Sequence, residues 1–240
     1  MELGRFLDVY TVKARLLPVL LVTLPIGLVT MILSPNTSLA WKTVWGLIGW
    51  SGGGFLLAQL GRDAGLKKES QLFKSWGGKP TTKMLRHRDF NNSVILARRH
   101  KKLKALIKDV KLPTSEEEAR DPNAADETYE ACATFLREKT RDRKEFALVF
   151  EENCSYGFRR NLWGMKPIGF IVSLLCLGVI IVSPIFEPSI LNDGRIGLVV
   201  LAGGANLFLM VLWVFVFRPS WVKVAANAYA ERLLEACEQL

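Results

Sequence analysis

A short segment rich in glycine, lysine and threonine contains the residue types that come nearest to a ligand-binding motif. Residues 75–82 read Ser-Trp-Gly-Gly-Lys-Pro-Thr-Thr. The glycine N–H groups and the Lys79 ammonium could bind a phosphate. Trp76 could cap a ligand, dock a neighbouring subunit or lie on a membrane surface. The segment does not match a nucleotide P-loop, because Lys79 is followed by proline and the first glycine of that motif is absent. We therefore predict a structural turn, with ligand binding through Trp76 and Lys79 as the alternative.

A run of basic residues lies on a predicted helix that begins after Asn92, a favourable N-cap, and ends near Val110. Apolar residues at helical spacing mark one face of this helix, and basic residues mark the other. The candidate binding residues on the basic face are Arg98, Arg99, Lys101 and Lys102. We expect them to bind a cytosolic protein partner, anionic lipid, or the acidic stretch 116–126 of the same or a neighbouring subunit. Nucleic acid or a nucleotide is a further alternative, but the aromatic residues that would stack on bases are missing.

The sequence offers little that suggests catalysis. His87-Arg88-Asp89 matches letters of the protein-kinase catalytic loop, but the other kinase motifs do not accompany it, and we interpret it as coincidence. The two histidines and four cysteines lack metal-ligand spacing, and we expect the cysteines to be free thiols in a reducing compartment. We predict no catalytic residue, metal or cofactor. An enzyme acting on lipids or nucleotides through Asp63 or Lys79 is the minor alternative.

The apolar residues that must position these groups are concentrated in four stretches without charged side chains. We predict membrane spans at about 16–33, 43–60, 167–186 and 196–217, because each is about as long as the ~17–25 residues that cross a bilayer as a helix. The spans form two hairpins, within 16–60 and 167–217. The predicted fold is therefore all-α: a four-transmembrane-helix protein with a helical cytosolic domain inserted between the second and third spans. That domain comprises residues 61–166, and the flanking segments are 1–15, an interfacial helix, and 218–240, an amphipathic helix.

The distribution of basic residues predicts the orientation of the spans. Residues 61–166 contain 24 of the 32 lysines and arginines, against 16 of the 23 acidic residues. The two short connections between spans carry only Lys42 and Arg195 as basic residues. Because basic segments that flank spans stay on the cytoplasmic side, we predict that the N-terminus, the C-terminus and the middle domain are cytoplasmic. We expect the membrane to be a bacterial inner membrane.

Turn and helix signals divide the middle domain and the tail. Residues 61–90 are predicted to be rich in turns, and the acidic stretch 116–126 is predicted to be a polar loop. Helices are predicted at 124–140 and at 144–162, the latter leading into the third span. The tail from Pro219 is predicted as a helix with proline in its first turn. One apolar face of that helix is formed by Val222, Ala226, Tyr229 and Leu233.

Small and polar residues within the predicted spans suggest close helix packing. The candidates for packing or for lining a pore are Gly49, Gly53, Gly203 and Asn206. Small residues let helix backbones approach one another closely, so packing within a bundle or homo-oligomer is the favoured interpretation. A conduit lined by Asn206, Gln59 and Ser51 is the alternative. The spans contain no acidic or basic residue, which argues against a coupled transporter.

These observations lead to two hypotheses for function. The first is an oligomeric, membrane-anchored sensor or scaffold that binds a cytosolic partner or anionic ligand through its basic domain. The second is a ligand-gated pore or membrane-disrupting effector formed by oligomerisation of the bundle. The two-plus-two layout with a cytosolic middle domain resembles that of small bacterial membrane components, including some in anti-phage defence, and an envelope-stress system would fit as well. That resemblance concerns layout alone and transfers no residue roles.

Overall fold

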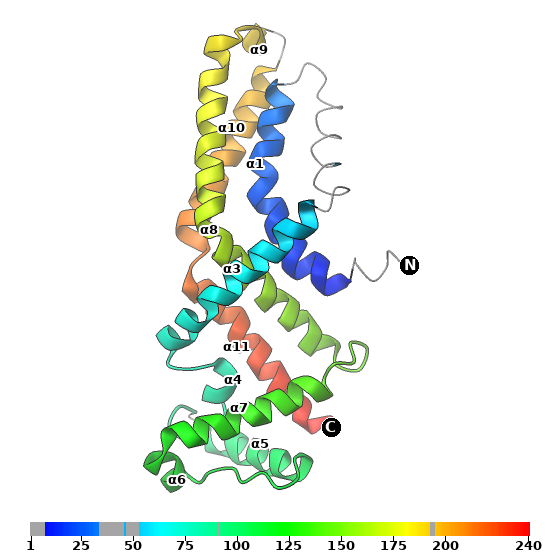
Figure 1. Cartoon of the computed structure of the whole chain (residues 1–240), viewed down its shortest axis with the longest axis vertical. Coiled ribbons are helices and arrows are strands. Elements are labelled where there is room, and N and C mark those ends of the chain that lie inside the picture. Colours follow the sequence, from blue (N-terminus) through cyan, green and yellow to red (C-terminus); the bar gives the residue numbers. More distant parts are fainter. Residues whose placement is uncertain (1–7, 34–45, 47–52, 91, 193–194) are drawn as a thin grey trace. The chain divides into compact units, whose positions relative to one another are not determined.

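The computed structural model describes residues 8–33, 46, 53–90, 92–192 and 195–240. Within these residues the regular elements are helices, and no strand is present (Figure 1). The prediction of an all-α protein is therefore confirmed. Phe6 and Leu7 of the predicted interfacial helix lie outside the described residues, as does Gly49.

Among the residues that the structure describes, three helical segments are long and apolar enough to cross a membrane. The first, Thr11–Leu33, combines the π-helical turn η2 (Thr11–Leu16) with α1 (Leu17–Leu33). The second lies in α8 (Ala147–Phe186), and the third combines α10 (Ile196–Val211) with η3 (Leu212–Val216). They match the first, third and fourth predicted spans. The second predicted span, 43–60, falls largely outside the described residues, and its last part forms the start of α3 (Gly53–Trp76).

Helix α3 corrects the prediction of a turn-rich segment after residue 60. It continues without a break to Trp76, although it contains Gly61 and Gly65. Glycine disfavours a helix interior by about 1 kcal/mol relative to alanine, which is why the segment looked like a series of turns. Here Gly65 lies against α8, where a Cβ on Gly164 would come within 2.5 Å of the Gly65 backbone nitrogen. The glycines are therefore needed for a close crossing of two helices.

Local capping signals set the boundaries of the helices in the middle domain. In α5 (Ser93–Leu106), the Asn92 side chain accepts a hydrogen bond from the Ile95 N–H, which confirms the predicted N-cap. The helix ends earlier than Val110, and Asp109 adopts a positive φ of 63°. The acidic stretch predicted as a loop is helical instead. It forms α6 (Ser115–Arg120), with a capping box between Thr114 and Glu117, and the start of α7 (Pro122–Lys139).

The remaining helices are short or C-terminal. They are α4 (Pro80–Lys83), α9 (Ser189–Asn192), α11 (Pro219–Glu235) and the 3-10 turn η4 (Ala236–Glu238). Helix α11 confirms the predicted tail helix. Its residues Val222, Ala226 and Leu233 are buried, as the apolar periodicity indicated.

The chain divides into two compact units. Unit 1 comprises Met1–Lys68 and Gly157–Val222, and unit 2 comprises Glu69–Tyr156 and Lys223–Leu240. The helices α3, α8 and α11 each contain residues of both units. Each unit has a hydrophobic core of its own.

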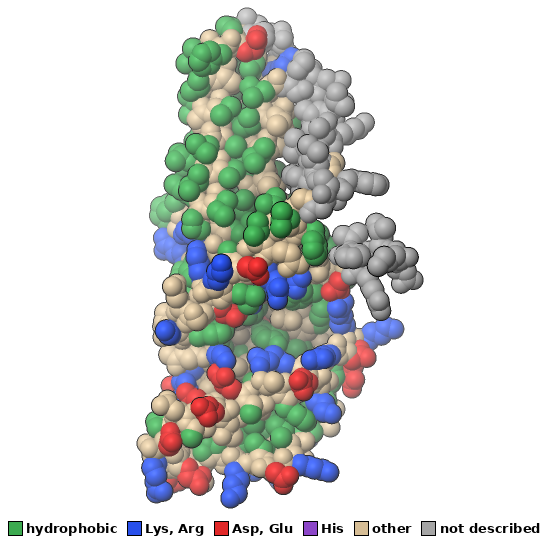
Figure 2. Space-filling view, viewed as in Figure 1, with side chains coloured by type: hydrophobic (Ala, Val, Ile, Leu, Met, Phe, Trp, Pro, Cys, Tyr) green, Lys and Arg blue, Asp and Glu red, His purple; other side chains and the backbone are tan. Residues whose placement is uncertain are grey.

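Unit 1 packs α1, α8 and α10–η3 around buried apolar side chains (Figure 1). Trp213 is fully buried among residues such as Val22 and Met165. Gly169 of α8 leaves room for this indole, because a Cβ there would lie 2.6 Å from Cε2 of Trp213. The opposite faces of the same helices carry large apolar side chains that are more than half exposed, among them Ile181, Ile185, Leu201 and Phe208. Figure 2 shows such a largely hydrophobic surface.

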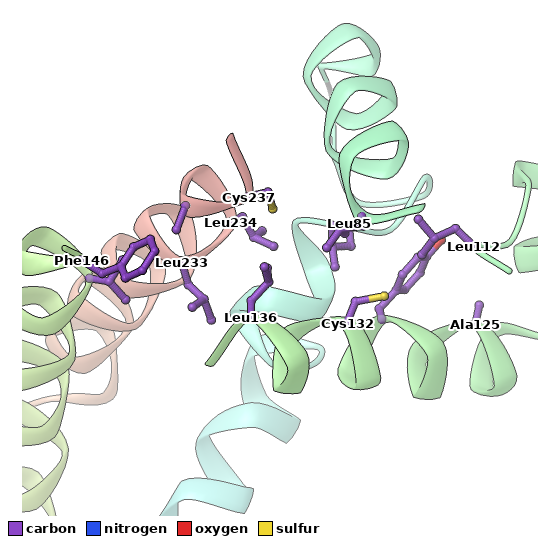
Figure 3. Packing of buried hydrophobic residues seen from close by; sticks show 13 residues of the cluster. Leu85, Leu112, Ala125, Cys132, Leu136, Phe146, Leu233, Leu234 and Cys237 are labelled. Carbon is purple, nitrogen blue, oxygen red and sulfur yellow. The ribbon is translucent and has the colours of Figure 1, made fainter. Parts of the chain in front are cut away.

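Unit 2 is built around side chains from α5, α7, η4 and the segments that join them. Figure 3 shows Leu233 and Leu234 of α11 lying opposite Leu136 of α7, with Leu85 and Cys132 farther along the same cluster. These five residues are no more than 2% exposed. Burial of each leucine contributes about 1.5–3 kcal/mol relative to leaving it in water, so this cluster is the main source of hydrophobic stabilisation in unit 2.

The close crossing of α3 and α8 at Gly65 and Gly164 can be tested by two substitutions in α8. We expect Gly164→Ala to destabilise the protein by about 1–3 kcal/mol, because the new methyl group would overlap the Gly65 backbone. Gly178→Ala is the matched control in α8, since nothing lies within 4 Å of its added Cβ. Thermal unfolding of the full chain in detergent measures both variants. Equal midpoints for the two would contradict the close crossing.

Candidate functional site

An arginine in unit 2 forms hydrogen bonds and ion pairs with several different elements of that unit. Arg86 follows α4 and is 7% exposed. Its Nε and Nη2 donate to the two carboxylate oxygens of Asp126 at 2.7 and 2.6 Å, a bidentate ion pair. Its Nη1 donates to Asp89 Oδ2 at 2.7 Å and to the Gly77 carbonyl at 2.8 Å. One guanidinium therefore ties the segment after α4 to α7 and to the turn after α3.

A second buried charge, Glu118 of α6, extends this network. Its carboxylate is 2% exposed and accepts hydrogen bonds from the Tyr129 hydroxyl at 2.7 Å, the His87 backbone N–H at 2.8 Å and Arg88 Nη1 at 3.0 Å. Burial alone would raise the pKa of Glu118, but these donors outweigh it and lower the pKa below the usual value. Arg88 also donates to Asp126 at 3.0 Å, so the two carboxylates share one cation.

The segment 75–82, predicted as a structural turn with phosphate binding as the alternative, is packed against this network. Gly77 and Gly78 have positive φ values of 78° and 134°, which glycine adopts without strain. The space beside Gly78 holds the Arg86 guanidinium, since a Cβ there would lie 2.7 Å from Nη2. Lys83 Nζ donates to the Trp76 carbonyl at 2.8 Å. An arginine thus occupies the position where a phosphate was considered, which favours the structural-turn interpretation.

The two candidate residues in that segment lie in different environments. Trp76 is 7% exposed and its ring meets Phe73 edge-on at 5.9 Å, so it packs inside unit 2. Lys79 is half-buried and forms an ion pair with Glu130 at 2.7 Å. Both side chains therefore have partners within the unit.

The four candidate residues of the basic face also lie in different environments. Arg98 is exposed and pairs with Glu238 of η4, and Lys101 and Lys102 are exposed. Arg99 differs from the expectation of an exposed basic face: it is 8% exposed, and its guanidinium lies 5.0 Å from the Phe90 ring centroid. The helix turn places Arg99 with Leu96 and Leu103 on the buried side, so the basic stripe is narrower than predicted.

Sequence reasoning did not identify the residues that form the Arg86 network. The kinase-like letters of His87-Arg88-Asp89 are interpreted as coincidence, and the three residues contribute instead to this network. His87 also meets His100 edge-on at 5.0 Å, and His100 Nε2 lies 2.8 Å from the Leu85 carbonyl. Burial lowers the pKa of His100. A usable signal was present, because four consecutive charged or ionisable residues, 86–89, lie directly between Leu85 and Phe90.

The Arg86 network is suited to holding the helices and connecting segments of unit 2 together. Burial raises the pKa of Tyr129, and hydrogen bonding to Glu118 raises it further, so this phenol stays protonated. Burial likewise raises the pKa of Cys132 and of Cys237 to about 11, so both are unreactive thiols. Among the described residues, no group of three histidine, cysteine, aspartate or glutamate side chains is placed to hold a metal ion.

The candidate residues of the spans are placed as follows. Gly53 is the first residue of α3, and a Cβ on Gly203 would make ordinary contact with Ile180, at 3.8 Å. Asn206 is fully buried in unit 1, and its Nδ2 donates to the Ala202 carbonyl one turn earlier, at 3.1 Å. Its Oδ1 has no hydrogen-bond partner among the described atoms. This position favours helix packing for Asn206.

Comparison with known proteins yields no relative. No protein-family model matches the chain, and neither the curated proteins nor the solved structures that we searched contain a match. Function must therefore be argued from the residues themselves.

The Arg86 network gives a testable difference in stability. We expect Arg86→Gln to destabilise unit 2 by about 3–5 kcal/mol, because it leaves Asp89 unpaired and Asp126 with only Arg88. Arg98→Gln removes an ion pair whose arginine side chain is 63% exposed, and should cost less than about 1 kcal/mol. Hydrogen exchange of α7 amides in the full chain measures both. Similar loss of protection in the two variants would refute the role assigned to Arg86.

Proposed function

We propose that this protein is an integral membrane protein, with the helices of unit 1 in the bilayer. Three apolar helices and their exposed large side chains support insertion, since water would be an unfavourable environment for such a surface. The distribution of basic residues supports cytoplasmic termini in a bacterial inner membrane. The second predicted span, 43–60, completes the proposed two-plus-two topology.

We propose further that unit 2 is a cytosolic binding unit for an acidic protein partner, so that the protein acts as a membrane-anchored scaffold or sensor. The observation that carries this proposal is the unpaired lysine face of α5, formed by Lys101, Lys102 and Lys104. All three are exposed, and none forms an ion pair within the described part of the chain. By comparison, four other cations of unit 2 have carboxylate partners: Lys79, Arg86, Arg88 and Arg98.

The clustering of three exposed, unpaired lysines within residues 101–104 is what favours this face for binding. Like charges three or four residues apart on a helix, as Lys101 and Lys104 are, repel one another by a few tenths of a kcal/mol. Carboxylates of a partner would offset this repulsion and would also accelerate association electrostatically.

Two alternatives receive less support. An enzyme would need a reactive group open to a substrate, whereas Glu118 and Tyr129 are engaged with each other in a buried network. A pore lined by Asn206 would need that side chain to face a conduit, whereas it is buried among the helices of a single chain. Homo-oligomerisation stays a prediction, since either lipid or a second copy could cover the apolar faces of unit 1.

A charge-reversal experiment tests the proposed lysine face. A photo-crosslinking residue placed at Ala105 in the full chain, in native membranes, should capture a partner whose acidic segment is then identified by mass spectrometry. We expect Lys101→Glu, Lys102→Glu and Lys104→Glu together to lower the affinity of that purified partner at least 100-fold. The loss should be smaller at high salt, because screening weakens the wild-type interaction.

The matched control reverses three exposed cations near the C-terminal end of α7: Arg137, Arg141 and Lys144. This control changes the net charge by the same amount on another part of unit 2. Its affinity for the partner should stay within about threefold of wild type, because these three cations lie outside the proposed lysine face. Equal loss in both triple variants would show that net charge, and not this face, determines binding.

A further inference from the structure

Several cations of unit 1 contact aromatic rings and backbone carbonyls. Lys68 Nζ donates to the Gly164 carbonyl at 3.2 Å and lies 5.3 Å from the Trp163 ring centroid. Arg159 donates to the Trp221 carbonyl at 3.0 Å, and its guanidinium lies 4.9 Å from that indole. Arg62 pairs with its neighbour Asp63 at a longer distance of 3.9 Å. Aromatic rings and carbonyls orient cations without cancelling their charge, so positive charge is retained at these positions.

Two further cations of unit 1 share one hydrogen-bond acceptor. Lys166 Nζ and Arg218 Nε each lie 3.4 Å from the Val214 carbonyl oxygen. Lys166 also donates to the Phe217 carbonyl at 3.2 Å, and the Arg218 guanidinium lies 5.6 Å from the Phe215 ring centroid. Neither cation forms an ion pair with a carboxylate among the residues that the structure describes.

The pair keeps hydrogen-bond donors for a ligand. An ammonium group has three N–H donors, and Lys166 uses two of them on carbonyls. A guanidinium has five, and Arg218 uses only Nε within the described structure, which leaves its planar Nη1–Nη2 edge. Such an edge matches the oxygens of a phosphate in a bidentate manner. The retained donors and charge therefore fit one anionic group that bridges the two side chains.

The surroundings indicate which source of phosphate fits. Lys166 directly precedes the charge-free stretch 167–186, and Arg218 directly follows the charge-free stretch 196–217. Beside them, the apolar side chains of Ile168, Ile171 and Phe215 are 55%, 54% and 61% exposed. Figure 2 shows Lys and Arg side chains along an edge of the hydrophobic surface. A ligand that contacts both the cations and this surface needs an anionic group and an apolar chain. An anionic phospholipid supplies these as its phosphate and its acyl chains.

We propose that Lys166 and Arg218 bind the phosphate group of an anionic phospholipid, whose acyl chains lie along Ile168, Ile171 and Phe215. The inference rests on the proposed membrane insertion of unit 1 and is independent of the acidic partner of unit 2. Insertion is measured separately, by resistance of the full chain to alkaline carbonate extraction. A chain that fails to insert is thereby distinguished from an inserted chain that lacks this site.

Native mass spectrometry of the delipidated full chain in neutral detergent tests the site. Phosphatidylglycerol should bind more tightly than phosphatidylcholine. The double variant Lys166→Gln, Arg218→Gln should weaken phosphatidylglycerol binding about 30-fold. The charge-conserving variant Lys166→Arg, which keeps the Arg218 guanidinium edge, should retain binding within a few-fold, which separates lost recognition from misfolding.

The matched control is Arg141→Gln, Lys144→Gln, which removes the same charge from exposed positions of unit 2 and should bind phosphatidylglycerol as wild type does. Unchanged binding by the Lys166 and Arg218 double variant would overturn the site. Equal binding of both lipids would overturn the role of headgroup charge. Displacement of the lipid by millimolar inorganic phosphate would assign the cations to a soluble anion and overturn the lipid proposal.

Discussion

Charged side chains must keep contact with water, with an opposite charge or with another polarisable partner, and this constraint shapes both units of the protein. Unit 2 satisfies it by pairing, with Arg86 bonded to Asp126, Asp89 and the Gly77 carbonyl. Because a buried charge left without its partner is costly, the pairing forces α4, α7 and the turn after α3 into one arrangement. In unit 1, some cations meet the constraint through aromatic rings and carbonyls next to apolar helices, as Arg159 does with Trp221.

Features that depend on local sequence were predictable. Charge-free stretches identified the three apolar helices that the structure describes, and the Asn92 cap and the apolar stripe of α11 were found from residue type and spacing. These signals act within a few residues of one another, through helix geometry and the first hydrogen bonds of a helix. They are sufficient to establish an all-α protein before any tertiary contact is known.

Features that depend on distant contacts were not predictable. In α3, Gly65 lies against Gly164, a residue about a hundred positions later in the chain. The two backbones approach so closely that a side chain would not fit between them. The Arg86 network joins residues separated by 40 positions, so the charged letters 86–89 carried no visible partner. Arg99 belonged to a basic run, yet one step around the helix places it in the interior beside Phe90. In each case the deciding neighbour lies on another element.

The proposed function depends on unit 1 lying in lipid, because unit 1 is what anchors unit 2 to a membrane. The most direct test is site-directed spin labelling of the full chain in vesicles, with its four native cysteines replaced by alanine. Labels at Leu175 and Phe208, which are 64% and 62% exposed, should be accessible to oxygen and shielded from a water-soluble nickel chelate. A label at Lys101 should be readily accessible to the nickel chelate and less accessible to oxygen. Ready access of the chelate to Leu175 and Phe208 would contradict the account.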